Sequence, residues 1–486
     1  MKLRELLKDI PVLECTADLE LDIENVYYDS RKVTENSLFV AVSGFASDGN
    51  RFIPMALSKG AVAVVTAKKP EVEVPYILVE SDRMALALLG CNFYGHPAKA
   101  MTMIGVTGTN GKTSTTLLLK QVLENCLGAK VGLIGTMANM VGEEVIPTER
   151  TTPESFELQG LFARMRDAGC SHVVMEVSSH AVTLERIGGT HFDIAAFTNL
   201  TEDHLDFHKT MEAYCEAKAD LFRRCDRAVI NADDSYASAM LAAAACPVLT
   251  TSVAEEKGLH AKNLELLAEG IRFTAVCGEE QAEVRLPIPG KFTVYNALTV
   301  LGVAKQLGIS LGNCADALKT AQGVKGRVEV VPTPGKPYSV LIDYAHTPDG
   351  LENVLSSVKD FCKGRLISVF GCGGDRDPIK RPIMGKIGVQ LSDIAIITSD
   401  NPRTENPMAI IEDILKGVNP ELGEYIVMED RRAAIRYAMD IAEKDDIIVL
   451  AGKGHETYQE INGQKYHLDE REEVAAHLEE LRNENG

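Results

Sequence analysis

Short apolar runs alternate with longer amphipathic segments along most of the chain. In the first half, strand-like runs lie at residues 37–44, 61–67, 172–177, 194–200 and 227–234. Apolar runs of about 4–8 residues bounded by turn residues are typical of buried strands. Because strands that alternate with helices form parallel sheets covered on both faces, the pattern predicts an α/β fold.

Two breaks in this pattern divide the chain. A helical segment that begins near residue 84 ends at Gly95 and Pro97, and Gly and Pro cluster again at residues 323–337. Such clusters are typical of connections. The sequence therefore predicts three domains: a small N-terminal α/β domain (1–98), a central domain with a mostly parallel sheet (99–330) and a C-terminal Rossmann-like α/β domain (331–486).

The rest of the pattern adds detail to the second and third domains. Residues 247–284 have a weaker pattern and predict a small antiparallel addition, followed by an amphipathic helix. The last domain has five apolar runs before a polar terminal helix at 470–486; the runs lie at residues 339–345, 365–371, 393–400, 424–428 and 446–452.

The charge balance excludes some partners. The 486 residues include 50 Lys and Arg against 70 Asp and Glu, a formal charge of −20. Such a surface disfavours nucleic acid and anionic membranes, whereas one local pocket can still be positive. No apolar run is long enough to span a bilayer, and the N-terminus has no secretory pattern. We expect a cytoplasmic protein, a monomer, with its eleven cysteines as buried free thiols.

The strongest chemical signal is the segment TGTNGKTS at residues 107–114, which follows an apolar run and precedes a helical segment. Glycines allow backbone N–H groups to face phosphate oxygens, and a helix N-terminus adds partial positive charge. Lys112 would reach the β- and γ-phosphates, and Thr113 or Ser114 could bind Mg²⁺. Val106 stands where the strict phosphate-loop pattern has glycine. The segment nevertheless predicts nucleotide binding.

Three other segments carry polar groups whose roles stay open. Glu176 ends an apolar run and could bind Mg²⁺, but Ser178 or Ser179 beside it could simply cap a helix. His204 lies in NLTEDHLDFH (199–208) as a metal ligand, a general base or part of a polar loop. Lys218, in a helical stretch, is by itself a surface lysine.

The last domain has three polar strand ends that predict one crevice. Residues 371–377 lack the spacing of a dinucleotide fingerprint, because position 376 is Arg. At residues 399–403, Asp400 could accept a hydrogen bond from an ammonium group and Arg403 could bind a carboxylate, a pairing that suits an amino-acid ligand. A turn around Pro402 is the alternative explanation of the same residues. The third end is Gly452 to Glu456.

Together these segments resemble the Mur ligase family, most closely its MurE type, which adds meso-diaminopimelate. The resemblance covers nearly the whole chain. It rests on the motifs above and on further matches in family order: Asp29-Ser30-Arg31, Thr151-Thr152-Pro153, Lys218 within residues 214–222, Asn296, Gly326-Arg327 and Asp343 to Pro348.

The resemblance implies a role for each matching residue. It implies a UDP-sugar-binding first domain, a central ATP-binding domain, a C-terminal amino-acid-binding domain, and Lys112, Lys218 and His204 as catalytic residues. The implied ATP site is Gly108, Thr109, Asn110, Gly111, Lys112, Thr113, Ser114, Asn296, Arg327 and Asp343. The implied site for UDP-MurNAc-dipeptide is Ser30, Thr151, Thr152, Ser178 and Arg186. The implied diaminopimelate site is Arg376, Asp400, Asn401, Pro402, Arg403, Gly452 and Glu456. The implied Mg²⁺ ligands are Thr113, Glu176, His204 and Lys218, the last as an N6-carboxylysine formed with CO2.

The implied activity is ATP-dependent amide formation in peptidoglycan precursor synthesis. The D-glutamyl carboxylate of UDP-MurNAc-L-Ala-D-Glu would form an acyl phosphate, which the amine of meso-diaminopimelate then attacks. The alternatives are a sister ligase that uses lysine or a D-alanyl dipeptide, a folylpolyglutamate-type ligase, and a nucleotide-binding regulator without catalysis. Arg403 disfavours lysine, because its guanidinium would lack the second carboxylate.

Overall fold

The computed structural model describes residues 1–44, 48–148 and 150–484. The chain divides into two units. The first consists of Met1–Leu259 and Thr299–Ser310, and the second of His260–Leu298 and Leu311–Gly486. Residues 485 and 486 of the predicted terminal helix lie outside the described residues, and the predicted domain limits at residues 98 and 330 stay predictions.

The first sheet is formed by the start of the chain. Its five strands have the order β1-β5-β4-β3-β2, and only β1 runs antiparallel to its neighbour. The residues of β3 are all buried, as expected for a parallel strand covered on both faces. Leu3 and Leu86 belong to the core on one face, and Ile53 to the core on the other. The elements are α1 (Leu3–Leu6), β1 (Val12–Cys15), β2 (Asn25–Tyr27), β3 (Ser37–Val40), η1 (Gly49–Phe52), α2 (Ile53–Ser58), β4 (Ala61–Thr66), β5 (Tyr76–Val79) and α3 (Asp82–Phe93).

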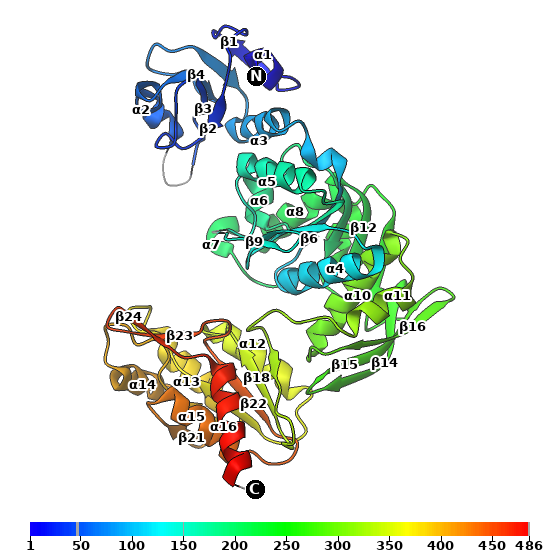
Figure 1. The fold of residues 1–486 in the computed structure, drawn as a ribbon, viewed down its shortest axis with the longest axis vertical. Helices are drawn as coiled ribbons and strands as arrows, with labels where there is room; N and C mark the ends of the chain where they lie inside the picture. The colour runs from blue at the N-terminus through cyan, green and yellow to red at the C-terminus, as the bar shows by residue number, and fades with distance from the viewer. Residues whose placement is uncertain (45–47, 149, 485–486) are drawn as a thin grey trace. The chain divides into compact units, whose positions relative to one another are not determined.

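The second sheet of the first unit is mostly parallel. Its order is β13-β12-β11-β6-β10-β7-β8-β9, with six parallel strands from β13 to β7 and an antiparallel extension at β8 and β9. The strands are β6 (Thr102–Thr107), β7 (Val131–Ile134), β8 (Asn139–Val141), β9 (Glu144–Ile146), β10 (His172–Glu176), β11 (Phe192–Phe197), β12 (Cys225–Asn231) and β13 (Val248–Ser252). The helices are η2 (Pro97–Ala100), α4 (Lys112–Leu127), α5 (Ser155–Asp167), α6 (Ser179–Thr183), α7 (Leu205–His208), α8 (Met211–Ala219), η3 (Asp220–Arg224) and α9 (Ala237–Ala243). Figure 1 labels β6, β9 and β12 and the helices α4 to α8 among these elements.

Strand β6 occupies the switch point of this sheet. The chain passes from β10 to β11 across β6, because β6 lies between them. In open α/β sheets, ligands bind beyond the carboxyl ends of the strands at such a point. The segment TGTNGKTS leaves β6 at that end, so the topology places it where a ligand is expected.

The next strands along the chain are β14 (Leu259–Leu267), β15 (Gly270–Cys277) and β16 (Glu280–Leu286). They are followed by α10 (Lys291–Gln306), whose residues from Thr299 onward belong to the first unit, and by α11 (Leu311–Leu318). Strands β15 and β16 pair antiparallel from Ile271–Leu286 to Cys277–Glu280. This confirms the antiparallel addition that the weaker pattern at 247–284 predicted, except that β13 is parallel to β12.

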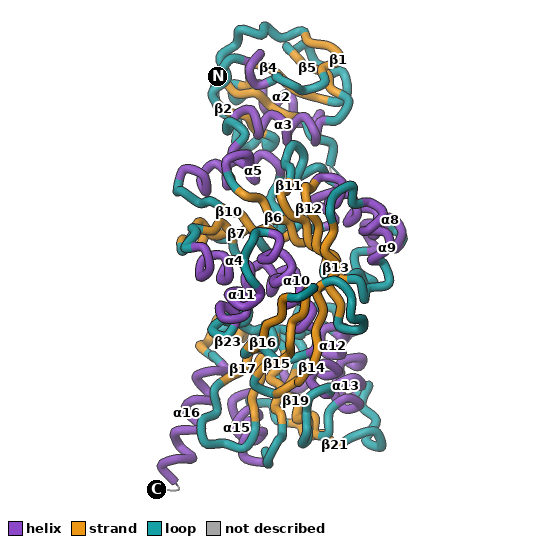
Figure 2. Tube along the Cα trace, turned by 90° about the vertical axis from the view of Figure 1, so that its right-hand side faces the viewer, coloured by secondary structure: helices purple, strands orange, loops and turns teal. Residues whose placement is uncertain are grey.

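The last sheet is Rossmann-like. Its order is β17-β18-β22-β19-β20-β21, and β17 alone is antiparallel to its neighbour. Residues of α12, α13 and α14 belong to the core on one face, and residues of α15 and α16 to the core on the other. The elements are β17 (Glu329–Val331), β18 (Ser339–Asp343), α12 (Pro348–Lys359), β19 (Leu366–Phe370), α13 (Lys380–Leu391), β20 (Ile394–Ile397), α14 (Pro407–Leu415), β21 (Glu424–Val427), α15 (Arg431–Ile441), β22 (Ile447–Ala451), β23 (Tyr458–Ile461), β24 (Gln464–His467) and α16 (Glu470–Glu484). Figure 2 shows the alternation of helices and strands along the chain.

The predicted fold class is confirmed: α/β, with a small N-terminal part, a central mostly parallel sheet behind a phosphate loop and a Rossmann-like C-terminal sheet. All eleven cysteines are free. The expectation that they are buried holds for six of them and is wrong for Cys15, which is exposed, and for the half-buried Cys126, Cys246, Cys277 and Cys362. Within the described residues no helix is long and apolar enough to cross a membrane.

Candidate active site

The loop after β6 is shaped for the close approach of a ligand. Gly108 and Gly111 have φ angles of 153° and 84°, in the region that glycine tolerates best. A Cβ at Gly108 would clash with the hydroxyl oxygen of Thr198. Asn199 fastens the loop from β11, because its backbone oxygen accepts from Thr109 N at 2.8 Å and its Oδ1 accepts from Asn110 N at 2.9 Å. Helix α4 begins at Lys112, so its N-terminus opens from this loop.

Two lysines share one backbone oxygen of the loop. Lys112 Nζ and Lys218 Nζ each donate to Gly108 O at 2.8 Å. Lys218, on α8, is 1% exposed, so the interpretation of it as a surface lysine is wrong. Burial lowers the pKa of Lys112, and burial together with the Lys112 charge lowers the pKa of Lys218 well below its ordinary value. The site therefore holds a lysine whose amine loses its proton more easily than that of an ordinary lysine.

Glu176 ends β10 beside the phosphate loop and is 1% exposed. Its Oε1 accepts from Thr113 Oγ1 at 3.0 Å and from Thr136 N at 2.9 Å, and its Oε2 accepts from Thr136 Oγ1 at 3.0 Å. A Cβ at Gly135 would clash with the same carboxylate. The two predicted oxygen ligands Thr113 and Glu176 are thus in direct contact, whereas Ser114 has no role that these contacts identify.

His204, unlike Glu176, has an exposed side chain. It has φ 54°, and its side chain is 48% exposed, with Nε2 3.4 Å from Asp203 Oδ2. Its ring centroid is 4.8 Å from that of His180 and 6.2 Å from that of Tyr214. Lys218 Nζ lies over the Tyr214 ring, 4.5 Å from its centroid. An aromatic cluster therefore connects His204 to the buried lysine.

No group of three or more His, Cys, Asp and Glu side chains in the described part of the chain is arranged to hold a metal. The predicted Mg²⁺ ligands include only one Glu and one His, so they would not form a metal site made of protein side chains alone. Mg²⁺ is often held by one or two carboxylates together with substrate phosphates and water. The carboxylate and hydroxyl oxygens of Glu176 and Thr113, beside a phosphate loop, fit that chemistry.

The predicted dipeptide residues gather at the end of β10. Thr152 Oγ1 donates to Glu176 O at 2.8 Å, and the same Thr152 Oγ1 lies 3.4 Å from Ser178 Oγ. Arg186 Nη1 donates to Thr152 O at 3.2 Å. Thr151 Oγ1 is 3.0 Å from Thr136 Oγ1, which connects this group to Glu176. Ser178 caps α6 through Ala181 N at 3.2 Å, so the alternative reading of a helix cap is confirmed for it.

Arg186 is one of three arginines around one carboxylate. Arg186 Nη2 is 2.8 Å from Glu154 Oε1, and Arg150 and Arg83 reach the same carboxylate at 3.5 and 3.8 Å. Burial is the largest cause that lowers the pKa of Arg186. Three guanidinium groups exceed the charge of one glutamate, which leaves a locally positive region on an acidic protein.

Ser30 borders a large cavity in the first unit. The cavity measures about 1320 Å³, and its lining includes Tyr28, Asp29, Arg31, Arg150 and Arg164. Ser30 itself is 6% exposed and donates to Met55 Sδ at 3.3 Å. Asp29 and Arg31 form an ion pair at 2.8 Å. A cavity of this size exceeds the roughly 300–1000 Å³ common for small-molecule pockets, so it can admit an elongated ligand.

The remaining predicted ATP residues lie in the second unit. Asn296 is buried on α10. Asp343, at the end of β18, accepts from Val328 N and Ala345 N, each at 2.8 Å, and burial raises the pKa of its carboxyl. Arg327 lies over the Tyr344 ring, 5.6 Å from its centroid.

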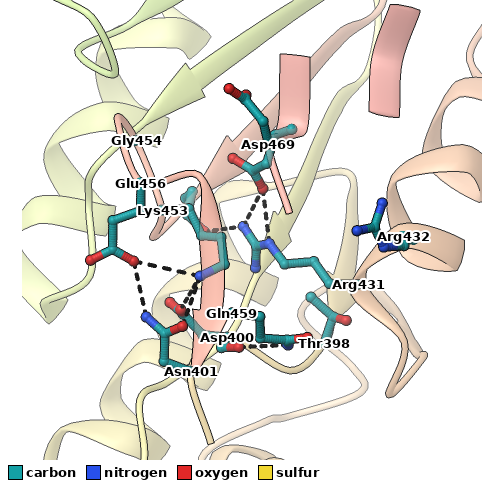
Figure 3. A network of polar contacts seen from close by, with 12 residues as sticks. Thr398, Asp400, Asn401, Arg431, Arg432, Lys453, Gly454, Glu456, Gln459 and Asp469 are labelled. Atoms are coloured by element: carbon teal, nitrogen blue, oxygen red, sulfur yellow. Dashed lines mark hydrogen bonds and ion pairs between the residues drawn. The ribbon is translucent and has the colours of Figure 1, made fainter. Parts of the chain in front are cut away.

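The predicted amino-acid site is assembled from three strand ends of the last sheet. Arg403 Nη1 donates to Gly374 O at 2.7 Å, and Arg403 Nε lies 3.3 Å from Glu460 Oε2. Asn401 Nδ2 donates to Glu456 Oε2 at 2.9 Å. A Cβ at Gly452 would lie 2.7 Å from Asp400 Oδ2, so that glycine permits a close approach. Figure 3 shows Asp400, Asn401 and Glu456 directed toward one another, so the polar strand ends lie together, whereas the crevice that they were predicted to form stays a prediction.

Pro402 and Arg376 also belong to the predicted diaminopimelate site. Pro402 is buried, and its backbone oxygen would clash with a Cβ at Gly374. Arg376 is exposed in the loop after β19. Their predicted contacts with a ligand stay predictions.

Sequence reasoning missed three side chains that organise the site. Thr136 holds Glu176, Tyr214 lies beside Lys218, and Lys453 lies fully buried among Asp400, Asn401 and Glu456. For Lys453 a signal existed, because a lysine between two glycines directly after an apolar run is an unusual strand end. Thr136 and Tyr214 carried no such signal.

Comparison with known proteins extends over the whole chain. The family models that match are "Mur ligase family, catalytic domain" at residues 22–94, "Mur ligase middle domain" at 106–304 and "Mur ligase, glutamate ligase domain" at 326–454. A relative from Clostridium acetobutylicum, UDP-N-acetylmuramoyl-L-alanyl-D-glutamate--2,6-diaminopimelate ligase 1, is 47% identical over 99% of this chain and 100% of its own. A ligase of the same name from Clostridium tetani, without the number, is also 47% identical, with 99% and 100% covered.

Solved structures agree with these relatives. The structure of a UDP-N-acetylmuramoyl-L-alanyl-D-glutamate--2,6-diaminopimelate ligase superposes with a TM-score of 0.80, at 32% identity over 99% of both chains. MurF from Acinetobacter baumannii has a TM-score of 0.57 at 17% identity, with 98% of each chain covered. At that identity the second likeness concerns the fold alone.

Proposed function

This chain belongs to the Mur ligase family, and we propose that it joins meso-diaminopimelate to the D-glutamyl carboxylate of UDP-MurNAc-L-Ala-D-Glu with consumption of ATP. The observation that carries this proposal is the identity of 47% over almost the full length to ligases named for 2,6-diaminopimelate. The reaction belongs to peptidoglycan precursor synthesis, and therefore to cell-wall growth, cell shape and division. Because it consumes ATP, we place it in the cytoplasm.

The reaction has two chemical steps. A carboxylate oxygen of the D-glutamyl group attacks the γ-phosphorus of ATP, and the bond to the ADP oxygen breaks, which forms an acyl phosphate and ADP. The amine of diaminopimelate then attacks the acyl carbon, loses a proton, and releases inorganic phosphate. Catalysis of phosphoryl transfer depends mainly on positioning and on neutralisation of charge. Lys112 and the N-terminus of α4 supply positive charge at the phosphate loop formed by Gly108, Thr109, Asn110 and Gly111.

Thr113 and Glu176 are the proposed primary ligands of Mg²⁺, with His204 and Lys218 as further ligands once substrates are bound. Bound Mg²⁺ would neutralise phosphate oxygens. The fit rests on the oxygen donors of Thr113 and Glu176, which are already 3.0 Å apart beside the phosphate loop. His204 is exposed and therefore accessible to a ligand.

Lys218 is proposed to carry a carbamate. A neutral lysine amine attacks CO2, a C–N bond forms, and one proton is released. The lowered pKa of Lys218 favours the neutral amine that this reaction needs. The product places negative charge beside Lys112, so repulsion between two lysines becomes attraction. This change gives a physical reason for a second lysine at the Gly108 oxygen.

The other predicted residues divide between the substrates. Ser30 borders the cavity proposed for the uridine nucleotide, and Thr151, Thr152, Ser178 and Arg186 are proposed to bind the dipeptide, whose carboxylates suit the positive region around Arg186. Asn296, Arg327 and Asp343 are proposed for the nucleoside of ATP. Arg376, Asp400, Asn401, Pro402, Arg403, Gly452 and Glu456 are proposed for diaminopimelate.

The first experiment measures phosphate release from ATP in the presence of UDP-MurNAc-L-Ala-D-Glu, with meso-diaminopimelate or L-lysine as the amine. We expect release that requires the acceptor and prefers diaminopimelate by roughly 10⁴-fold in kcat/KM, because a site that binds a polar group strongly rejects an analogue without it. A preference for lysine would contradict the proposed amine, and no release with either amine would contradict the proposed reaction.

Arg403→Ala tests the amine site. We expect KM for diaminopimelate to rise roughly 10²-fold, because a bidentate guanidinium–carboxylate contact is lost. The KM for ATP should stay nearly constant. Arg436→Ala, which removes a half-buried arginine of α15 that pairs with Glu480, is the matched control. Steady-state kinetics with each substrate varied in turn give these values, and equal changes for both substrates would contradict the assignment.

A further inference from the structure

Lys453 is a fully buried lysine at the carboxyl end of β22. Its side chain is 0% exposed. Its Nζ lies 2.9 Å from Asn401 Oδ1, 3.4 Å from Asp400 Oδ1 and 3.5 Å from Glu456 Oε2. Figure 3 shows the ammonium between these three side chains. A buried charge is costly unless it is paired and hydrogen-bonded, and here one ammonium has three oxygen partners.

Asn401 shows how far this ammonium determines the surrounding geometry. Its Oδ1 accepts from Lys453 Nζ and also from Glu460 N at 2.9 Å. Its Nδ2 consequently faces the opposite side and donates to Glu456 Oε2 at 2.9 Å. Two donors, Lys453 Nζ and Glu460 N, therefore fix the orientation of the amide, and the amide in turn holds Glu456; of the two, Lys453 Nζ is the donor that also lies beside Asp400 and Glu456.

The backbone that carries Lys453 is held in place independently. Arg431 Nη2 donates to Ala451 O at 2.8 Å, and Gly452 N donates to Asp343 O at 3.0 Å. Arg471 Nη2 donates to Gly454 O at 3.0 Å. Because the backbone on both sides of Lys453 is fastened, the ammonium is a fixed reference point for the loop after β20.

We propose that Lys453 is a positioning residue of the diaminopimelate site, which sets Asp400, Asn401 and Glu456 in their binding geometry without touching the ligand itself. This inference rests on the proposed function. The absence of exposed side-chain surface excludes direct contact with a ligand in this conformation. A site whose polar groups are held by such a support discriminates strongly between similar ligands.

Lys453→Met tests the proposal, because methionine has a similar length without charge or donors. We expect KM for diaminopimelate to rise roughly 10- to 100-fold, the loss typical when a residue that orients binding groups is removed. The KM for ATP and for the UDP-linked dipeptide should change by less than about threefold. A fall in kcat with all three KM values unchanged would indicate loss of folded enzyme only, and would overturn the proposal.

Two further variants make the result specific. Lys120→Met removes another buried lysine, one that pairs with Glu124 at 2.6 Å outside the proposed sites, and should leave KM for diaminopimelate unchanged. Asn401→Ala and the double variant Lys453→Met/Asn401→Ala complete a double-mutant cycle. We expect the double variant to be little worse than Asn401→Ala alone. Additive effects would overturn a role of Lys453 through Asn401.

Lys453→Gln covers the case in which the methionine variant does not fold. Its amide retains N–H donors without the charge, so KM for diaminopimelate should rise less than with methionine. A folded Lys453→Gln enzyme with wild-type KM, and wild-type stabilisation by diaminopimelate in thermal unfolding, would overturn the proposal. The wild-type enzyme in the same assay reports on the proposed function separately, because its failure to use diaminopimelate would contradict the reaction and not the role of Lys453.

Discussion

Replacing Lys112 by alanine should lower ligation turnover at least about 10³-fold while the fold survives. Lys112 Nζ is held at the phosphate loop by Gly108 O and Thr109 O, each at 2.8 Å, so its charge is placed before ATP binds. Loss of this charge removes electrostatic stabilisation at the transferred phosphoryl group. The fold should persist, because the variant removes a desolvated ammonium without leaving an unpaired carboxylate. Phosphate release and thermal unfolding measure the two effects.

Lys120→Ala is the control for this prediction. Lys120 lies on the same helix α4 and pairs with Glu124, but it is not at the phosphate loop. This variant should lose stability and keep its turnover. A Lys112→Ala enzyme with near-normal turnover would contradict the role of Lys112 in phosphoryl transfer.

Replacing Lys218 by alanine should also abolish ligation. The amine of Lys218 is buried against Gly108 O, where burial and the neighbouring Lys112 favour its neutral form. If this amine carries a carbamate, its loss removes one negative charge that two oxygens share, and leaves Lys112 without its partner. We expect a loss of turnover of at least about 10³-fold, similar to the loss of other charge-stabilising groups. Kinetics, and mass spectrometry of the intact wild-type protein for an added carboxyl group, test both parts.

Lys218→Arg separates the carbamate from the positive charge of a lysine. Arginine retains a cation but does not form a carbamate, so this variant should be as inactive as Lys218→Ala. Depletion of CO2 and bicarbonate should lower wild-type turnover, and their return should restore it. An active Lys218→Arg enzyme would show that an anionic group at this position is dispensable.

The apolar pattern predicted most of the sheet strands because a strand covered on both faces must be apolar along its whole length. Strands β4, β19 and β22 are examples, since each lies within a predicted run. The same logic missed β17, at the edge of the last sheet, and the separate two-stranded sheet of β23 and β24, because residues of these strands are half-buried or exposed. It also extended the run at 37–44 beyond Val40, where β3 ends.

The candidate site was predictable where its chemistry is local. The phosphate loop depends on glycines at Gly108 and Gly111 and on a helix that begins beside them, all within a few residues. The contact of Glu176 with Thr113 and Thr136 is not local, because it depends on the alignment of β6, β7 and β10. The sequence placed Glu176 at a strand end, and the family resemblance grouped it with Thr113 as a Mg²⁺ ligand, but nothing in the sequence indicated its contact with Thr136.

Lys218 and Lys453 show most clearly which properties the sequence determined and which the tertiary structure decided. By itself the sequence determined the alternation of strands and helices, the phosphate loop and the family resemblance, since these follow from residues close together in the chain. Only the tertiary structure decided that Lys218 is buried 2.8 Å from the Gly108 oxygen and that Lys453 lies among three oxygen-bearing side chains. The reason is physical: burial and pairing of a charge depend on residues about 50 to 110 positions away, which the folded sheets bring together.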